Sequence, residues 1–418
     1  MFVGRLAEIE RLETHLLQTV SGNPSNFLII GERGIGKSSL LNYFKWVAAG
    51  DLRLADTQVR FLVIDTDIEP ATNQLALVQK IELGLRRSLG TTEPARHFLR
   101  TAWEFLQRVE AGGVRLHKAD AAQDVSVLIE EFAYSLAETT NRITSESEAS
   151  ALFGTRYDGV LILVVEADNS SQDLRLGSFL KLLLERVHRR GCDRVMVGLA
   201  GLPSVRQILA EGHASSPRLF DSVHLGRLTP QEVSRVIDLA LEQAEKDNGI
   251  RCGITSGGRG LLTSLSEGYP HFIQQFGFSA FDTDRDDEID DTDVLNGALG
   301  RMGALELIGD RYYRDDFYNK IQGESYRQVL RIMAEQLDGW VARKQLREKF
   351  RGKDSVLNNA IKALRDRHII LSKEGERGVY RLQHKGFALW IKLKTTDPSQ
   401  LQISMENGEK GSPTEGES

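Results

Sequence analysis

Residues 26–41 read NFLIIGERGIGKSSLL, an apolar run that leads into glycines, a lysine and two serines. Residues 31–38 match the pattern G-x-x-x-x-G-K-S of a phosphate-binding P-loop, with a predicted strand before it and a predicted helix after it. The glycines let backbone N–H groups surround phosphate oxygens, and the start of the helix adds a partial positive charge. Lys37 is expected to reach the β- and γ-phosphates, and the Ser38 hydroxyl to bind magnesium. The stretch predicts binding of ATP and Mg²⁺ through Gly31, Glu32, Arg33, Gly34, Ile35, Gly36, Lys37, Ser38 and Ser39.

Short apolar, β-branched runs recur along the first 280 residues and alternate with segments of helical period. They occupy residues 27–30, 59–65, 159–166 and 194–200, and residues 220–228 supply a fifth candidate. This alternation is typical of a parallel sheet that is buried on both faces, so the fold class is predicted to be α/β. Residues 89–155 read as a mostly helical insertion before the third strand, with VRLHK (114–118) as a possible hairpin piece.

The third predicted strand runs into VLILVVEADNSS, residues 160–171, where a P-loop ATPase places an Asp-Glu pair. If Glu166 is the general base, Val165 occupies the position of the magnesium-linked Asp. If Glu166 is the magnesium-linked acid, Ala167 occupies the position of the base. In either alignment one acid is missing, which predicts slow or absent hydrolysis unless Asp168 or Asp65 compensates. Glu166 is therefore the catalytic candidate, and Ser38 and Asp168 are the candidate metal ligands.

Positive charge is concentrated in the C-terminal part of the chain. Residues 324–394 hold 17 Lys and Arg against 8 Asp and Glu, a balance of +9 in a chain of net charge −6. Residues 325–336, 342–350 and 355–370 read as helices, followed by a hairpin around Gly375 and Gly378, which is the order of a winged helix. In a DNA-binding winged helix the contacts would be Asn358, Asn359, Lys362, Arg365, Lys373 and Arg377. A protein-docking role and a role as a lid over the nucleotide remain open.

Composition limits the broad class of the protein. The 418 residues are 41% apolar and 27% charged, which predicts a globular chain of two or three domains. The sequence has no apolar run of about 18 residues and no signal peptide, so we expect a cytoplasmic protein without a membrane partner. Cys192 and Cys252 are too few for a disulfide framework. The acidic segment 282–293 is interpreted as a solvated linker at a domain boundary, and residues 396–418 as a disordered tail.

Several motifs together resemble one family. FVGRLAEIERL (2–12), the P-loop, VVEADN (164–169), VMVGLAGLPSVRQIL (195–209), SSPRLFDSVHLGRLTPQEVSRVI (215–237), SEGYPHFIQQFGFSAF (266–281) and the basic C-terminal module carry the resemblance. It is to the AAA+ ATPases of the ORC/Cdc-like, archaeal-ATPase and STAND neighbourhood, of AAA16 type. The resemblance implies a P-loop core at 1–225, a helical lid at 226–310 and a winged-helix domain at 311–395.

The same resemblance implies roles for individual residues. Phe2, Val3, Gly4 and Arg5 match the segment that lies against adenine and ribose in this family. Arg218 matches the arginine finger that is offered to a neighbouring subunit, although it could instead pair with a surface acid. Pro270 and His271 stand where the sensor-two arginine is usual, and VGLAG at the end of the fourth strand lacks the usual polar sensor-one residue.

Two classes of function remain open from the sequence. The first is a nucleotide-gated oligomeric switch or scaffold with weak hydrolysis, acting with a protein partner in a bacterial defence or signalling assembly. The second is a DNA-associated ATPase that loads or remodels complexes on duplex DNA. Val165 and the missing sensor groups favour the first class, and the basic winged helix favours the second. Both imply a homo-oligomer.

Overall fold

The computed structural model describes residues 3–54, 57–111, 121–249, 251–314, 317, 323–336, 339–367, 369–373 and 375–395. The chain divides into two compact units between Gly226 and Arg227. The predicted contact Phe2, the possible hairpin piece at 114–118 and the predicted tail at 396–418 lie outside the described residues. None of the described helices combines the length and apolarity that crossing a bilayer requires.

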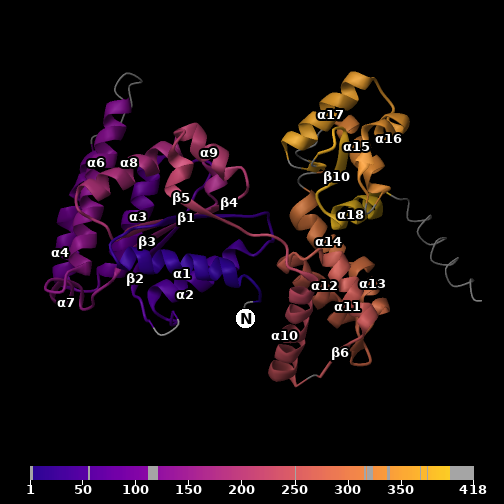
Figure 1. Ribbon diagram of the computed structural model, residues 1–418, viewed down its shortest axis with the longest axis horizontal. Coiled ribbons are helices and arrows are strands. Elements are labelled where there is room, and N and C mark those ends of the chain that lie inside the picture. Colours follow the sequence, from indigo (N-terminus) through magenta and orange to yellow (C-terminus); the bar gives the residue numbers. More distant parts are fainter. Residues whose placement is uncertain are drawn as a thin grey trace, which may run out of the picture. The chain divides into compact units, whose positions relative to one another are not determined.

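A parallel sheet forms the centre of the N-terminal unit (Figure 1). Its strands within the described residues are β1 (Asn26–Ile30), β2 (Phe61–Asp67), β3 (Gly159–Val165), β4 (Val195–Gly201) and β5 (Phe220–His224), in the spatial order β2-β3-β4-β1-β5. β4 is buried along its whole length and β3 along all but its last residue, as expected when helices cover both faces. The α/β fold class predicted from the apolar runs is confirmed.

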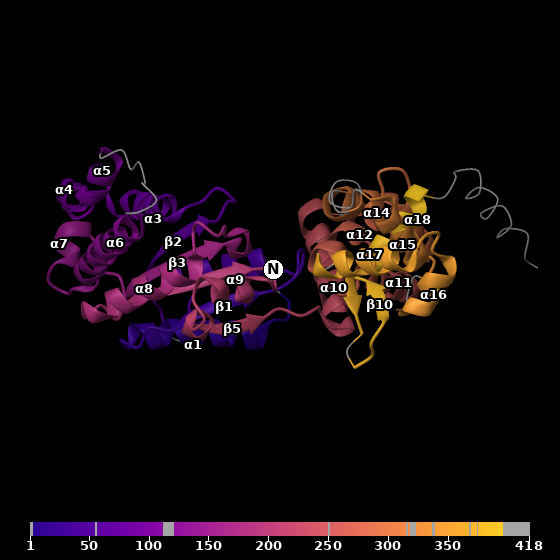
Figure 2. The same cartoon turned by 90° about the horizontal axis from the view of Figure 1, so that it is seen from above.

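Helices cover both faces of this sheet (Figures 1 and 2). α1 and α2 pack on one face, and α3, α6 and α8 lie over the other, with α9 against α8. The bounds are α1 (Leu6–Val20), α2 (Lys37–Ala49), α3 (Gln74–Leu89), α8 (Leu176–Arg189) and α9 (Val205–Gly212), with short turns η1 (Ala167–Asn169) and η2 (Ser216–Leu219). Because these strands are parallel, the carboxyl ends of β1, β3 and β4 lie on the same side of the sheet.

The described part of the predicted insertion is helical. It consists of α4 (Glu93–Ala102), α5 (Glu104–Ala111), α6 (Ala121–Thr144) and α7 (Ala149–Phe153). Trp103, only 1% exposed, anchors this region and donates its indole N–H to the Thr139 hydroxyl at 3.2 Å. α6 packs on α8 and β3, so the insertion shares the core of the unit rather than forming a separate domain.

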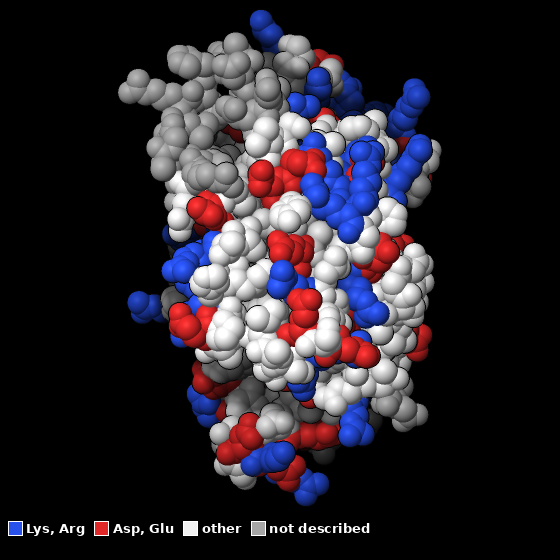
Figure 3. Space-filling model, turned by 90° about the vertical axis from the view of Figure 1, so that its left-hand side faces the viewer, with Lys and Arg blue, Asp and Glu red and all other residues white. Residues whose placement is uncertain are grey.

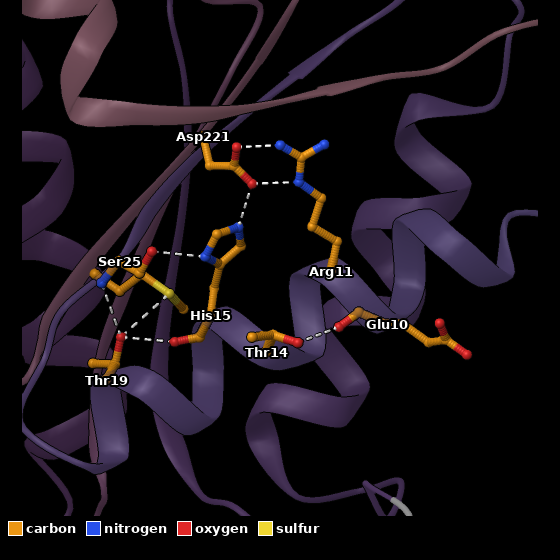
Figure 4. Close-up of polar contacts among 8 residues, drawn as sticks. Glu10, Arg11, Thr14, His15, Thr19, Ser25 and Asp221 are labelled. Atoms are coloured by element: carbon orange, nitrogen blue, oxygen red, sulfur yellow. Dashed lines mark hydrogen bonds and ion pairs between the residues drawn. The ribbon is translucent and has the colours of Figure 1, made fainter.

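A polar network fixes α1 to the start of β5 (Figure 4). The guanidinium of Arg11 donates two hydrogen bonds to the Asp221 carboxylate. His15 lies between Asp221, at 3.1 Å from Nε2, and the Ser25 hydroxyl, at 2.7 Å from Nδ1. Burial lowers the pKa of His15, an effect that the nearby Asp221 carboxylate partly opposes. The network therefore links α1 to Ser25, the residue before β1, and to the start of β5.

The C-terminal unit is mostly helical. Its helices are α10 (Pro230–Asn248), α11 (Ser256–Ser266), α12 (Pro270–Thr283), α13 (Asp291–Leu299), α14 (Ala304–Ile308), the π-turn η3 (Gly309–Tyr313), α15 (Glu324–Ala334), α16 (Arg343–Lys349), α17 (Asp354–Asp366) and α18 (Lys385–Thr395). Its strands are β6 (Gly253–Ile254), β7 (Glu288–Ile289), β8 (Val341–Ala342), β9 (Ile370–Ser372) and β10 (Val379–Leu382). β9 and β10 form the predicted hairpin and β8 pairs with β10, in the order that a winged helix has.

An aromatic core holds this unit together. Tyr269 and Phe272 at the start of α12 contact the His384 ring, with centroids 4.6 and 5.5 Å away. Tyr313 contacts Phe387 of α18 at 4.7 Å, and Trp390 of α18 is fully buried. The predicted lid and the predicted winged helix thus share one core.

The acidic segment 282–293 is not the solvated linker that the sequence suggested. It contains β7, which pairs with β6, and it begins α13. The Asp290 carboxylate accepts the Asp293 N–H at 2.9 Å, and the Asp293 carboxylate accepts the Asp290 N–H at 3.0 Å. This reciprocal capping box satisfies N–H groups at the start of a helix, which explains acids at these positions.

Candidate nucleotide site

The P-loop connects the end of β1 to the first residue of α2. Gly34 and Gly36 have φ values of +77° and +101°, in the left-handed region that favours glycine. The loop begins beside β4, because Gly31 donates its N–H to the carbonyl of Gly201 at 3.3 Å. Ser38 and Ser39 lie exposed in the first turn of α2, and Arg33 is exposed on the loop. The hydroxyls and the helix start therefore remain accessible to phosphate and to a cation.

Lys37 is folded back onto its own loop. Its ammonium donates to the carbonyls of Gly31, at 2.6 Å, and Glu32, at 2.9 Å. Burial lowers the pKa of Lys37, and the attraction of Asp168 is the largest opposing effect. An arriving phosphate offers this ammonium a charged acceptor in place of two neutral carbonyls, and charge-assisted hydrogen bonds are the stronger kind.

Arg5 braces the P-loop from outside. Its guanidinium donates to the carbonyl of Ile35 at 3.2 Å and to the carbonyl of Gly226 at 2.5 Å. The side chain is 8% exposed, and the residue has a φ of +65° as the N-cap of α1. Val3 and Gly4 lead into this cap. No local pattern predicts the contact between Arg5 and Ile35, since the two residues are 30 positions apart.

The end of β3 carries the acids that the sequence singled out. Val165 is the last residue of the strand and is half-buried. Glu166 follows with a φ of +53°, and its carboxylate accepts the side-chain amide of Asn169 at 3.0 Å. An aliphatic group thus stands where a magnesium-linked acid is expected, and the next carboxylate is held in the turn.

Asp168 links the end of β3 to the end of β4 and acts electrostatically on Lys37 of the P-loop. Its Oδ1 accepts the N–H of Leu202 at 2.9 Å, directly after the end of β4. A Cβ on Gly201 would lie 2.8 Å from the same oxygen, so glycine at this position makes room for the carboxylate. A polar group therefore does stand at the end of β4, contributed by η1, the turn that follows β3. Gly201, the last residue of VGLAG, was the only sequence signal that a side chain packs against the end of β4.

Asp65 does not belong to this cluster. Its carboxylate pairs with Lys45 of α2 at 2.6 Å. The alternative in which Asp65 compensates for Val165 is therefore not supported, because this acid is already engaged by a cation. Of the acids considered from the sequence, Asp168 and Glu166 are the ones that act electrostatically on Lys37.

Arg218 lies far from the P-loop of its own chain. It belongs to η2, immediately before β5, whereas the P-loop follows β1. β1 and β5 are parallel and in register from Asn26 opposite Phe220 to Ile30 opposite His224. Arg218 therefore lies at the amino ends of these strands, and the P-loop lies at their carboxyl ends. The side chain is exposed, and no acid among the described residues pairs with it.

The remaining predicted site residues lie in the C-terminal unit. Pro270 begins α12, and Nε2 of His271 lies 2.8 Å from a guanidinium nitrogen of Arg311. Burial lowers the pKa of His271, and Arg311 lowers it further, so the ring acts as a neutral acceptor for Arg311.

The predicted nucleic-acid contacts lie on α17 and the hairpin. Asn358 accepts from Arg343 at 2.9 Å, whereas Lys362 and Arg365 are exposed and have no ion pair within the described residues. On the hairpin, Lys373 pairs with Glu376 at 2.5 Å. Asn359 and Arg377 are also exposed.

Comparison with known proteins identifies the N-terminal part. Residues 1–191 match the family model described as the AAA ATPase domain, AAA_16. The N-terminal part of the chain is an AAA ATPase domain. No significant match was found among curated protein sequences.

Two solved structures are similar to the chain over most of its length. The Walker-type ATPase of Pyrococcus abyssi has a TM-score of 0.56 at 14% identity, over 94% of this chain and 96% of that one. The ORC2 protein of Aeropyrum pernix, solved in ADPNP–ADP complexes, has a TM-score of 0.52 at 17% identity, over 96% and 95%. At these identities the likeness shows the fold of the AAA ATPase, and its activity has to be argued from the site.

Proposed function

We propose that the protein is an ATP-binding AAA+ switch whose nucleotide controls self-assembly and is hydrolysed slowly. The P-loop amides and Lys37 would hold the phosphates, and Ser38 and Asp168 would hold Mg²⁺, with Asp168 acting through the water shell of the ion. Arg5 would keep the loop in its binding conformation. A multi-protein defence or signalling assembly is the setting that the motif resemblance suggests.

The arrangement at the end of β3 carries the proposal of slow hydrolysis. Val165 cannot accept a hydrogen bond from a magnesium-bound water, and Oδ1 of Asp168 already accepts the N–H of Leu202, which leaves only Oδ2 of this carboxylate for the water shell of the ion. Glu166, the candidate base, is held by Asn169. Loss of positioning at one catalytic element commonly costs about a hundredfold or more in rate.

Restoring the missing acid tests this proposal. Val165→Asp should raise ATP hydrolysis at least about tenfold at saturating ATP and magnesium, because an Asp-Glu pair would then follow β3. Val165→Asn is the matched control, since it adds a polar group of the same size without a charge, and it should leave the rate within about twofold. A wild-type rate near the typical enzyme median of about 10 s⁻¹ would contradict slow hydrolysis, as would an Asp variant that is no faster.

A second candidate function is duplex DNA binding by the C-terminal module. The observation that favours it is the pair of exposed cations without ion-pair partners among the described residues, Lys362 and Arg365, on one helix of a basic module. Neutralising both should weaken binding to all duplex sequences and reduce the salt slope by about 2, through lost counterion release. Lys349→Ala is the control, because this lysine is paired with Glu335. Fluorescence anisotropy at several salt concentrations measures both quantities, and absence of duplex binding at low salt would exclude this candidate.

A further inference from the structure

The helical insertion contains a hollow that is separate from the nucleotide site. It has a volume of about 330 Å³ and lies between the end of α3, α4 and α5. Figure 3 shows the side of the molecule that carries α4 and α7, where Lys and Arg side chains form groups among scattered acids. The described residues that line the hollow are Arg86, Gly90, Glu93, Arg96, His97, Arg100 and Gln107.

The lining is basic. It holds three guanidinium groups and one carboxylate, a balance of about +2 when His97 is neutral, and the Glu82 carboxylate beside Arg86 lowers the local balance to about +1. Arg96 is held by Glu93, at 2.7 Å, and by the carbonyl of Gly90, at 3.3 Å. Arg86 is held by Glu82, whose side chain is only 12% exposed. Arg100 has neither a hydrogen bond nor an ion pair to any residue in the described ranges.

The partners of Arg86 and Arg96 fix their guanidinium planes at the rim of the hollow. A fixed, planar guanidinium matches the oxygens of phosphate or carboxylate and loses little entropy on binding them. Arg100 adds a cation whose donors are open to a ligand. The carboxylates of Glu82 and Glu93 each pair with one guanidinium, which leaves Arg100 as the cation of the lining that no carboxylate in the described ranges pairs with.

We infer that the hollow binds a small, non-aromatic phosphorylated ligand with at least two negative charges. Three guanidinium groups can donate to more than one anionic group of a ligand, and 330 Å³ admits a molecule of the size of a sugar bisphosphate or a short polyphosphate. Apart from His97, the described lining offers no aromatic ring, so it lacks the stacking surface that commonly holds a nucleobase. The lining shares no residue with the P-loop, so the ligand would act at a second site of the AAA domain.

The test measures binding by isothermal titration calorimetry in the full chain carrying Lys37→Ala, which removes the main anion contact of the P-loop. Inorganic pyrophosphate and fructose 1,6-bisphosphate are the two probes, and AMP is the aromatic comparison. One or both probes should bind saturably at low salt and more tightly than AMP. Affinity should fall as salt increases, because the contacts are exposed ion pairs.

Two arginine variants in the same background locate the site. Arg100→Gln should weaken binding at least tenfold, because it removes the cation that is open to the ligand. Arg87→Gln is the matched control: this exposed neighbour of Arg86 on α3 does not line the hollow, and its loss should change affinity less than twofold. Failure of both probes to bind, or equal affinity in the Arg100→Gln variant, would overturn the inference. Tighter binding of AMP would overturn the non-aromatic class of ligand.

Discussion

Asp168 hydrogen-bonds to the residue after β4 and attracts Lys37 of the P-loop electrostatically. Asp168→Asn keeps the oxygen that accepts the Leu202 N–H and removes only the negative charge. We expect the folded state to be retained and the magnesium-dependent part of ATP affinity to fall about tenfold, since a charge-assisted contact is lost. ATP titrations with and without magnesium measure this difference. An Asn variant with undiminished magnesium dependence would assign the metal to Ser38 alone.

His384 provides a pH test at the residue scale. It is buried, and burial together with the nearby Arg227 and Arg381 lowers its pKa to about 3. Between pH 6.5 and 3, His384 is therefore protonated in the unfolded chain and neutral in the folded chain. The free energy of unfolding falls as pH is lowered through this window. The loss from this residue is about 1.4 kcal/mol for each pH unit.

A non-titrating substitution isolates the contribution of His384. His384→Gln should show a shallower loss of stability than the wild type between pH 6.5 and 5, whatever its stability at neutral pH. Urea unfolding at each pH, followed by tryptophan fluorescence, measures the two slopes, since Trp390 is buried in the same core. Parallel slopes would mean that His384 is protonated in the folded unit.

At the scale of elements, α1 links the P-loop to the strand that follows Arg218. Arg5 at its N-cap holds the P-loop, and Arg11 and His15 hold Asp221 at the start of β5. Asp221→Ala should destabilise the N-terminal unit by about 1–3 kcal/mol, because it leaves Nε2 of the buried His15 imidazole without its partner. Asp193→Ala is the control, since the His188 that it pairs with is 72% exposed, and it should cost less than about 0.5 kcal/mol. Equal costs in chemical denaturation would contradict a structural role for the network.

The strands were predictable from sequence because each is a short apolar run between helical segments, and burial on both faces dictates that pattern. The P-loop was predictable because its function requires glycines and a lysine at fixed spacing. The acidic segment was misinterpreted because charge density alone does not reveal a capping box. The position of Asp168 against Gly201 depends on the pairing of β3 with β4, which no local pattern encodes.

At the scale of the whole molecule, the position of Arg218 decides whether the nucleotide site is complete in one chain. η2 lies at the amino ends of the strands and the P-loop lies at their carboxyl ends. Arg218 therefore cannot reach a nucleotide phosphate bound at the P-loop of its own chain without unfolding β5. A second copy can present it, because the side chain is exposed. If Arg218 contacts a neighbour's γ-phosphate, ATP should favour an oligomer and ADP should not.

Substitution of Arg218 tests this assembly directly. In the wild type, ATP with magnesium should raise the mass measured by light scattering above that of the monomer, and ADP should not. Arg218→Ala should abolish the shift while ATP affinity of the isolated monomer changes less than about twofold, because the residue is remote from its own P-loop. Arg53→Ala, another exposed arginine of the N-terminal unit, should behave like the wild type. One unchanged mass under all conditions would exclude a nucleotide-gated oligomer. A shift that survives in Arg218→Ala would mean that assembly is driven by other contacts, and that the AAA domain senses its nucleotide within a single chain.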